Sequence, residues 1–364
     1  MAVTGRESAG VVLVTGSSGF IGKPVIRRLA RAFRMIGFDR EGGSHPPREA
    51  EGVCVDLTSD QDVEGAFERI RYAYEGRIAS VVHLAAYYDF SGEPSPLYDE
   101  ITVRGTARLL SALRAFDVEQ FIFSSTMLVH APCEPGERLN EEWPLDPKWD
   151  YPRSKVATEE LIRRERGPIR AVSLRIAGVY DDECHSIPLA NQIQRIFERK
   201  LTSKVFPGDT SRGQAFVHLK DVVEAIGKTV EHRHQLGPDE TFLIGEPDTL
   251  SYDDLQRAFG RLIHGEDWET QSIPKAVAKA GAWLEDQVPG EEPFIKPWMI
   301  DLADDHYALD IGRARSVLGW EPQRSLRDTL PRMVSALKAD PLQFYKENKL
   351  EAPSWLEQNV VSKK

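Results

Sequence analysis

The chain has 364 residues, of which 41% are hydrophobic and 28% are charged, and its formal net charge is -11. This composition is typical of a globular protein, and no apolar run approaches the roughly 18 residues that a membrane span needs. The acidic balance argues against binding to nucleic-acid phosphates, which depends on clustered Lys and Arg. We therefore expect neither a nucleic acid nor a membrane among its partners.

The three cysteines Cys54, Cys133 and Cys184 are far apart, and an odd number cannot form a complete set of disulfides. The first ten residues lack the charged-then-apolar plan of a secretory signal, so we expect a cytoplasmic protein. Cys184 beside His185 supplies two metal ligands, but no second pair follows at zinc-like spacing. The sequence therefore predicts no metal site.

Short β-branched or aromatic runs alternate with longer helix-patterned stretches through the first half of the chain. Strands are predicted over residues 11–15, 34–38, 52–55, 80–84, 120–124 and 170–175. Most of these runs are continuously apolar, as in a parallel sheet covered on both faces. They predict an α/β, Rossmann-like, doubly wound parallel sheet with its ligand crevice at the carboxyl ends of the strands.

Beyond residue 175 the pattern becomes irregular, and Pro188, Pro207 and Gly208 punctuate a loop and a helical stretch at 189–200. Strand-like residues 215–219 and 241–244, on either side of a helical pattern at 222–231, predict that the chain returns to the main sheet. We therefore assign 1–175 and 215–245 to the Rossmann-like domain. A smaller C-terminal substrate-binding lobe takes 176–214 and 246–340, and 341–364 form a C-terminal tail.

The first predicted strand runs directly into a glycine-rich turn and then into a helical pattern. Gly16 allows the tight turn, Gly19 lets the backbone approach a pyrophosphate, and Gly22 permits close helix packing. The free amides at the start of the helix face the anion. An ordinary glycine-rich turn is the alternative, and the strand-turn-helix setting argues against it. The predicted dinucleotide site contains Gly16, Ser18, Gly19, Phe20, Ile21 and Gly22.

The second predicted strand ends at Asp39, 17 residues after Gly22 and near the spacing expected of a carboxylate that binds the adenosine ribose. That carboxylate would repel the 2′-phosphate of NADP, whereas Arg40 beside it could attract the same phosphate. On this balance we expect NAD rather than NADP.

Tyr151 and Lys155 head a further helical pattern, and residues four apart lie on one helix face. A phenol with a pKa of about 10 is a poor base at neutral pH, and a neighbouring ammonium lowers that pKa by favouring the phenolate. The pair therefore predicts a tyrosine that exchanges a proton. The same spacing also occurs on ordinary surface helices, so supporting site geometry is needed.

Taken in order, these motifs resemble the extended short-chain dehydrogenase/reductase family, also called the NAD-dependent epimerase/dehydratase group, over nearly the whole chain. The glycine signature matches residues 16–22, the YxxxK pair matches Tyr151 and Lys155, and Thr126 lies 25 residues before Tyr151. Other matches are Asp56-Leu57, His83-Leu84-Ala85-Ala86, Ser124-Ser125-Thr126 and the segments 174–180, 216–221 and 314–322.

The resemblance implies that Thr126 hydrogen-bonds the reacting oxygen, Tyr151 exchanges its proton, and Lys155 binds the nicotinamide ribose and lowers the tyrosine pKa. It also implies a homodimer that pairs through the helices around 103–115 and 155–164. Beyond the glycine turn, the residues that it assigns to NAD are Asp39, Arg40, Asp56, Leu57, Leu84, Ala85, Ala86, Ser124, Tyr151, Lys155 and Ala177.

The substrate side departs from the family pattern. An arginine that grips the diphosphate of nucleotide sugars is replaced by Gln214, and the usual Asn of the sixth-strand segment is Gly178. A neutral amide lacks the charge for that contact, which argues against a nucleotide sugar. The resemblance puts Tyr88 and Met127 near the substrate, where they would suit an apolar molecule, although packing under a loop is an equal alternative. The expected substrate contacts are Tyr88, Thr126, Met127 and Gln214.

We expect an NAD-dependent enzyme of epimerase/dehydratase type that acts on a small molecule by reversible hydride transfer at a hydroxyl or carbonyl carbon, with Tyr151 as acid and base. One alternative is a net NAD(P)-dependent dehydrogenase or reductase on a hydrophobic alcohol or ketone. A second alternative is a non-catalytic dinucleotide sensor, and the presence of Thr126, Tyr151 and Lys155 together argues against it.

Overall fold

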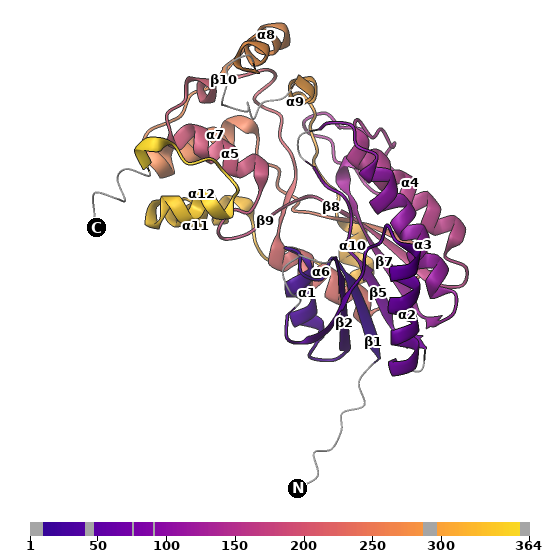
Figure 1. The fold of residues 1–364 in the computed structure, drawn as a ribbon. Coiled ribbons are helices and arrows are strands. Elements are labelled where there is room, and N and C mark those ends of the chain that lie inside the picture. The colour runs from indigo at the N-terminus through magenta and orange to yellow at the C-terminus, as the bar shows by residue number, and fades with distance from the viewer. Residues whose placement is uncertain (1–9, 41–46, 75, 90–91, 287–296, 357–364) are drawn as a thin grey trace, which may run out of the picture.

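The structure is a computed structural model that describes residues 10–40, 47–74, 76–89, 92–286 and 297–356. The described chain forms two lobes (Figure 1). The seven-stranded sheet and the helices α1 to α4, α6 and α10 make up one lobe, and α5, α7, α11 and α12 gather in the other. None of the helices in the described ranges is long and apolar enough to cross a membrane.

A seven-stranded parallel sheet forms the centre of the first lobe, in the order β12-β8-β7-β5-β1-β2-β3. The strand order reverses between β1 and β5, which is where ligands bind in doubly wound sheets. The sheet confirms the predicted fold class. Its strands are β1 (Val11–Thr15), β2 (Arg34–Asp39), β3 (Ala50–Cys54), β5 (Ser80–His83), β7 (Gln120–Thr126), β8 (Arg170–Ile176) and β12 (Asp239–Ile244).

Alternating side chains of the strands pack into separate cores on the two faces of the sheet. Val12 and Val14 of β1 belong to one core, and Leu13 between them belongs to the other. The first core is completed by α1 (Gly22–Leu29), α6 (Leu219–Glu231) and α10 (Gly312–Leu318). The second is completed by α2 (Asp60–Tyr74), α3 (Gly105–Leu113) and α4 (Asp150–Glu165). Burial on both faces explains why an inner strand such as β1 is almost continuously apolar, whereas the edge strand β3 is only partly buried.

The second lobe has a core of its own, built by α5 (Ile187–Phe197), α7 (Tyr252–His264), α11 (Leu326–Ala339) and α12 (Pro341–Glu347). Phe344 and Tyr345 of α12 are almost fully buried in it. Residues 341–356, which we expected to form a tail, therefore contribute to the lobe; 357–364 lie outside the described residues. Above this lobe lie α8 (Lys275–Asp286) and α9 (Pro297–Asp301) (Figure 1).

The return of the chain to the main sheet differs from the prediction. β12 joins the sheet beside β8, but β11 (Phe216–His218) pairs instead with β9 (Gly178–Tyr180) in a separate two-stranded sheet. β9 follows β8 directly and diverges from it, taking β11 as its partner. A Cβ atom at Gly178 would lie 2.8 Å from the Phe216 ring, so this pairing favours glycine there.

The remaining described elements are short. They are β4 (Arg77–Ile78), β6 (Asp117–Val118), β10 (Val205–Phe206), β13 (Gln271–Ser272), η1 (Tyr98–Arg104), η2 (Met127–Val129) and η3 (Leu201–Lys204).

Candidate functional site

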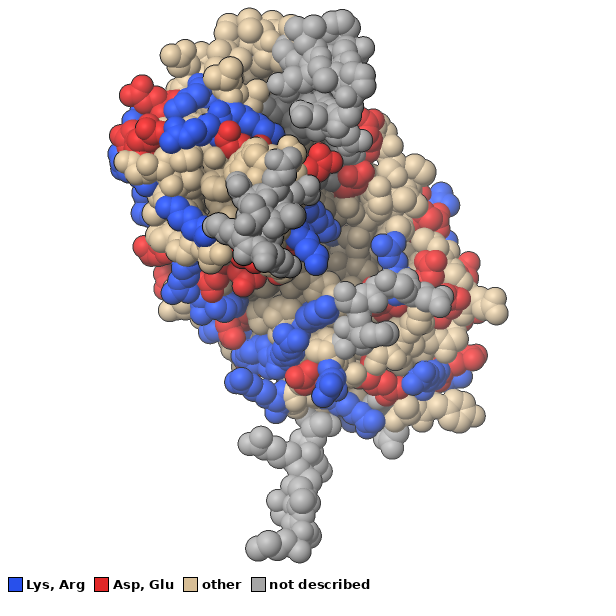
Figure 2. Space-filling view, turned by 60° about the vertical axis from the view of Figure 1, so that its left-hand side comes forward, with Lys and Arg blue, Asp and Glu red and all other residues tan. Residues whose placement is uncertain are grey.

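A cavity of about 670 Å³ lies at the carboxyl ends of the central strands and is lined from both lobes. Residues after β1, β5, β7 and β8 form one side of it, and residues of α5, α7 and α9 form the other. In the space-filling view the surface is hollowed between the two lobes (Figure 2). Fifteen predicted site residues line it: Gly16, Gly19, Phe20, Ile21, Gly22, Leu84, Ala86, Tyr88, Ser124, Thr126, Met127, Tyr151, Lys155, Ala177 and Gln214.

The glycine turn has the geometry of a pyrophosphate cradle. Gly16 has a φ of +66°, and a Cβ atom at Gly22 would lie 2.2 Å from the Gly16 carbonyl oxygen. Within the described chain, the side-chain hydroxyls of Ser17 and Ser18 are buried without a hydrogen-bond partner. Because unpaired hydroxyls and free amides at the start of a helix suit an anion, the residues present fit a dinucleotide phosphate.

Acidic side chains stand beside this turn at the ends of β2 and β3. The Asp39 carboxylate accepts hydrogen bonds from the backbone N–H groups of Ser18 (2.7 Å) and Arg40 (2.9 Å). Hydrogen bonds from the backbone and hydroxyl of Thr58 lower the pKa of Asp56, which is exposed. Asp39 is thus fixed next to the turn, where a ribose would follow a pyrophosphate.

The other six predicted residues are not part of the cavity lining among the described residues: Ser18, Asp39, Arg40, Asp56, Leu57 and Ala85. Leu57 is buried in the core under α3, and the Ala85 backbone N–H donates to the Thr15 hydroxyl at 3.1 Å. Leu57 and Ala85 therefore shape the strand ends from beneath, whereas Arg40 and Asp56 face solvent.

The three predicted catalytic side chains meet on one wall of the cavity. Thr126 ends β7, and its hydroxyl is hydrogen-bonded to the Tyr151 side chain. Lys155 lies one turn after Tyr151 on α4; its Nζ atom donates to the Ser124 carbonyl oxygen at 2.8 Å and lies 5.6 Å from the centre of the Tyr151 ring. Strand β7 and helix α4 therefore supply the whole constellation.

Burial governs the protonation of this pair. It raises the pKa of Tyr151 to about 12, against a smaller lowering by the Thr126 hydrogen bond. Burial also lowers the pKa of Lys155 to about 7, and the negative charge of Glu159 opposes that shift. We expected Lys155 to lower the tyrosine pKa; in the structure the loss of solvation raises it instead.

This leads to a prediction about stability and pH. Between pH 7 and the ordinary lysine value of 10.5, the unfolded chain holds a proton that the folded chain has lost at Lys155, so the free energy of unfolding rises with pH. In Lys155→Met this contribution is absent. Denaturant titrations should show that the free energy of unfolding of the variant exceeds that of the native protein by most near pH 7. This difference should shrink by up to about 1.4 kcal/mol per pH unit towards pH 9. A difference that stays constant over this range would refute the buried, weakly basic lysine.

Aromatic rings surround the Tyr151 phenol. The centre of the Tyr88 ring lies 4.9 Å from that of Tyr151 in an edge-on contact, and the centre of the Trp149 ring lies 5.4 Å from it. Trp149 in turn stacks on Trp298 of α9 at 5.0 Å. Met127 lines the cavity and also packs in the core, so both interpretations of that residue apply. Neither tryptophan was predicted from the sequence, although the position of Trp149, two residues before Tyr151, was a signal.

Two arginines that line the cavity differ in their partners. Arg212 donates from Nη2 to Glu134 at 2.7 Å, and its Nε lies 3.8 Å from an Asp209 oxygen. Arg195 also lines the cavity, but within the described chain it bonds only the Asn191 carbonyl of its own helix, at 3.4 Å. Arg195 was not singled out from the sequence, because a basic residue in a helix usually faces solvent.

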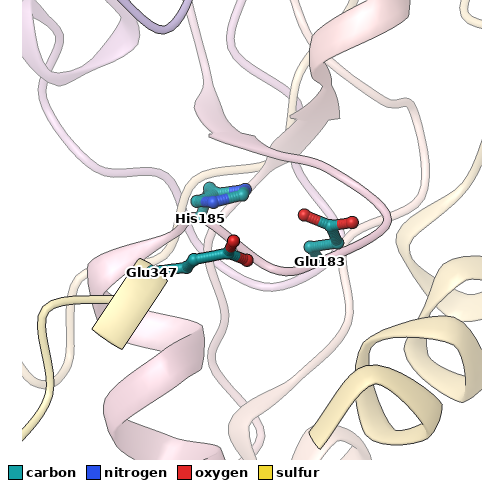
Figure 3. Close-up of side chains that lie close together, drawn as sticks. All are labelled: Glu183, His185 and Glu347. Carbon is teal, nitrogen blue, oxygen red and sulfur yellow. The ribbon is translucent and has the colours of Figure 1, made fainter. Parts of the chain in front are cut away.

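Glu183, His185 and Glu347 come close together beside the second lobe, each offering a ligand atom within 4.8 Å of the others (Figure 3). The His185 Nδ1 atom is 2.8 Å from the Asp181 carboxylate, which raises the pKa of the imidazole. Both glutamates are exposed. Exposed carboxylates of this kind do not by themselves define a metal site, so the absence of a metal stays a prediction.

Residues 12–245 match the family described as the NAD dependent epimerase/dehydratase family. The chain is 28% identical over 350 residues to a UDP-glucose 4-epimerase of Mycolicibacterium smegmatis, covering 88% of this chain and 96% of that one. It is 25% identical over 373 residues to human 3 beta-hydroxysteroid dehydrogenase type 7, covering 93% and 98%.

Solved structures share the fold. A UDP-glucose 4-epimerase of Thermus thermophilus in complex with NAD superposes with a TM-score of 0.67 and 24% identity, over 90% of this chain and 99% of that one. A UDP-glucuronic acid 4-epimerase of Bacillus cereus, in complex with UDP-glucuronic acid and NAD, gives a TM-score of 0.67 at 21% identity, with coverages of 90% and 99%.

Proposed function

Because this chain belongs to the NAD-dependent epimerase/dehydratase family, we propose that it interconverts a secondary alcohol and a ketone on a largely apolar substrate. Members of this family are NAD-dependent enzymes of the extended short-chain dehydrogenase/reductase type. One observation carries the proposal: Thr126, Tyr151 and Lys155 lie together on the wall of a cavity that is otherwise mainly apolar and aromatic. Such cavities bind apolar molecules and orient them with a few polar groups.

We propose that the glycine turn of residues 16–22 holds the pyrophosphate of NAD and that Asp39 holds the adenosine ribose. Lys155 would hold the nicotinamide ribose, since its Nζ atom is anchored at the end of β7. When bound, NAD accepts a hydride from a carbinol carbon or returns it. Residues 1–175 and 215–245 would then form the cofactor domain, and 176–214 with 246–356 the substrate lobe.

Tyr151 is the proposed acid and base. Its phenol donates a proton to a carbonyl oxygen in reduction and accepts one from a hydroxyl in oxidation, while the Thr126 hydroxyl orients that oxygen. Burial holds the pKa of Tyr151 near 12, so the phenol keeps its proton at neutral pH. A protonated Lys155 opposes this by favouring the phenolate. Reduction is therefore favoured near neutral pH and oxidation at higher pH.

The apolar lining favours a substrate that contains a hydrocarbon ring system. Tyr88, Trp149 and Trp298 offer flat faces beside the reacting tyrosine. Arg212 is engaged by Glu134, and Gln214 carries no charge, so neither supplies a free cation for a diphosphate. The human relative is named for a 3β-hydroxysteroid, and an alcohol of this apolar class is the substrate that we propose.

UDP-sugar epimerisation is the second candidate, with the hydride returned to the same molecule. Arg195 favours it, because within the described chain this guanidinium lines the cavity without a carboxylate partner. The Mycolicibacterium smegmatis relative is named for this reaction on UDP-glucose. A phosphate needs such a cation, whereas a hydrocarbon does not.

Arg195→Met separates the two candidates. We expect the variant to oxidise a 3β-hydroxysteroid with NAD within about twofold of the native rate, since no anion has to be bound. If UDP-glucose is the substrate, loss of a charge-assisted contact should instead raise its KM by about tenfold or more. Both reactions are followed on native enzyme and variant, by cofactor absorbance and by chromatography of the sugar product. Conversion of UDP-glucose without conversion of the steroid would overturn the first candidate.

A homodimer and a cytoplasmic location stay predictions from the sequence. The sedimentation of the purified protein would test the first of them directly.

A further inference from the structure

A buried carboxylate stands directly behind the proposed catalytic pair. Glu159 follows Lys155 by one helical turn and Tyr151 by two turns on α4, so the three lie along one side of the helix. Only 2% of Glu159 is exposed. A charged side chain is almost never buried so fully unless it is paired, and its partners therefore indicate what it does.

Each oxygen of the Glu159 carboxylate has more than one donor. Oε1 accepts from the Ser125 hydroxyl at 2.5 Å and from Arg175 Nε at 3.1 Å, and Oε2 accepts from Arg175 Nη2 at 2.7 Å. Arg163 approaches Oε2 at 3.3 Å. Arg175 lies on β8 and is itself buried, and it also donates to the His130 ring and the Glu141 carbonyl.

The Ser125 contact links the two elements that carry the reacting groups. Ser125 stands on β7 between Ser124, whose carbonyl holds Lys155, and Thr126, whose hydroxyl meets Tyr151. Three successive residues of β7 therefore contact α4: Ser124 contacts Lys155, Ser125 contacts Glu159, and Thr126 contacts Tyr151. A slip of α4 along β7 would break the Ser125 bond together with both catalytic contacts.

The charge of Glu159 reaches Lys155 as well. Burial lowers the pKa of the Lys155 ammonium, and the negative charge of Glu159 raises it. Arg175 is positive and close to Glu159, so without the carboxylate the ammonium would face an unscreened buried cation.

We propose that Glu159 is a positioning residue, which locks α4 to β7 through Ser125 and keeps Lys155 able to carry its charge beside Tyr151. Glu159 touches neither substrate nor cofactor in this account. It acts through Ser125 and Lys155, and the inference rests on the proposed roles of Tyr151 and Lys155.

Titration of isotopically labelled lysine and tyrosine by NMR tests this without any substrate. Glu159→Gln should lower the titration midpoint of Lys155 by about one pH unit or more, since it removes a negative charge that opposes the effect of burial. Glu160→Gln, at the exposed neighbouring position of the same helix, should leave the midpoint unchanged. Calorimetry should show the affinity for NAD falling several-fold in Glu159→Gln alone.

Two further variants separate positioning from general stability. Ser125→Ala keeps the ion pair with Arg175, so the Lys155 midpoint should stay within a few tenths of a unit while NAD affinity falls. Glu159→Asp retains the charge, and we expect it to keep the midpoint near that of the native protein; it also serves if Glu159→Gln does not fold.

The inference would be overturned if Glu159→Gln and Glu160→Gln had the same titration midpoint of Lys155 and the same affinity for NAD. So would a midpoint in Glu159→Asp that drops as far as in a folded Glu159→Gln. Full activity of a Tyr151→Phe variant would instead refute the proposed function, and the two failures are thus distinguishable.

Discussion

Tyr151→Phe should reduce turnover by about 10²–10⁴-fold, which is the usual contribution of a positioned acid or base. The substitution removes one hydroxyl and leaves the ring, so the edge-on contact with Tyr88 and the contact with Trp149 remain. Binding of NAD should therefore stay within about threefold of the native protein. Oxidation of a 3β-hydroxysteroid by stopped-time assay, with calorimetry of NAD, measures both quantities.

The matched control is Tyr72→Phe, which removes an equivalent hydroxyl from a tyrosine that is 93% exposed on α2. It should leave turnover and NAD binding unchanged. Equal activity in the two variants would mean that another group exchanges the proton, and loss of NAD binding in Tyr151→Phe would point to a structural role instead.

Gly22→Ala is expected to disrupt the NAD site. The added methyl carbon would lie 2.2 Å from the Gly16 carbonyl oxygen and 2.9 Å from the Ser17 Cα, both of them backbone atoms that cannot rotate away. The turn must open, and crowding of this kind destabilises a fold by about 1–3 kcal/mol. Since the same amides form the proposed pyrophosphate cradle, NAD affinity should fall by tenfold or more.

Gly65→Ala provides the comparison, because it adds the same methyl group to helix α2, where no described heavy atom lies within 4 Å of it. In a helix interior this change stabilises the fold by about 0.5–1 kcal/mol. Calorimetry of NAD and thermal unfolding of both variants test the pair. Native NAD affinity in Gly22→Ala would exclude the glycine turn as the cofactor site.

The central sheet could be predicted from the sequence because its signal is local. Inner strands such as β1 are short apolar runs buried on both faces, whereas the edge strand β3 is only partly buried. The observed bounds of the strands differ from the predicted ones by a residue or two. The glycine turn and the Tyr151–Lys155 spacing are equally local. They depend on backbone geometry within one turn or one helix.

Features that depend on contacts between distant segments could not be predicted. The pairing of β9 with β11 joins Gly178 to Phe216, and the wall of the cavity joins Trp149 to Trp298. Neither contact has a periodic pattern that marks it. The raised pKa of Tyr151 was missed for a similar reason, since it results from burial by the surrounding structure and not from the neighbouring lysine.

Glu159 shows the same limit on a smaller scale. Its position one turn after Lys155 was visible in the sequence, but its partners Ser125 and Arg175 belong to two different strands. A glutamate on a helix rich in charged residues is usually solvated. Only the arrangement of β7, β8 and α4 shows that this carboxylate is buried.

The most direct test of the proposed chemistry follows the hydride itself. A 3β-hydroxysteroid deuterated at its carbinol carbon is incubated with NAD and the enzyme, and mass spectrometry of cofactor and steroid locates the label. The account predicts that deuterium accumulates in the cofactor as the ketone forms and that Tyr151→Phe slows this transfer by the same factor as turnover. Steroid that keeps all of its label, while UDP-glucose is epimerised with no net change in NAD, would contradict it.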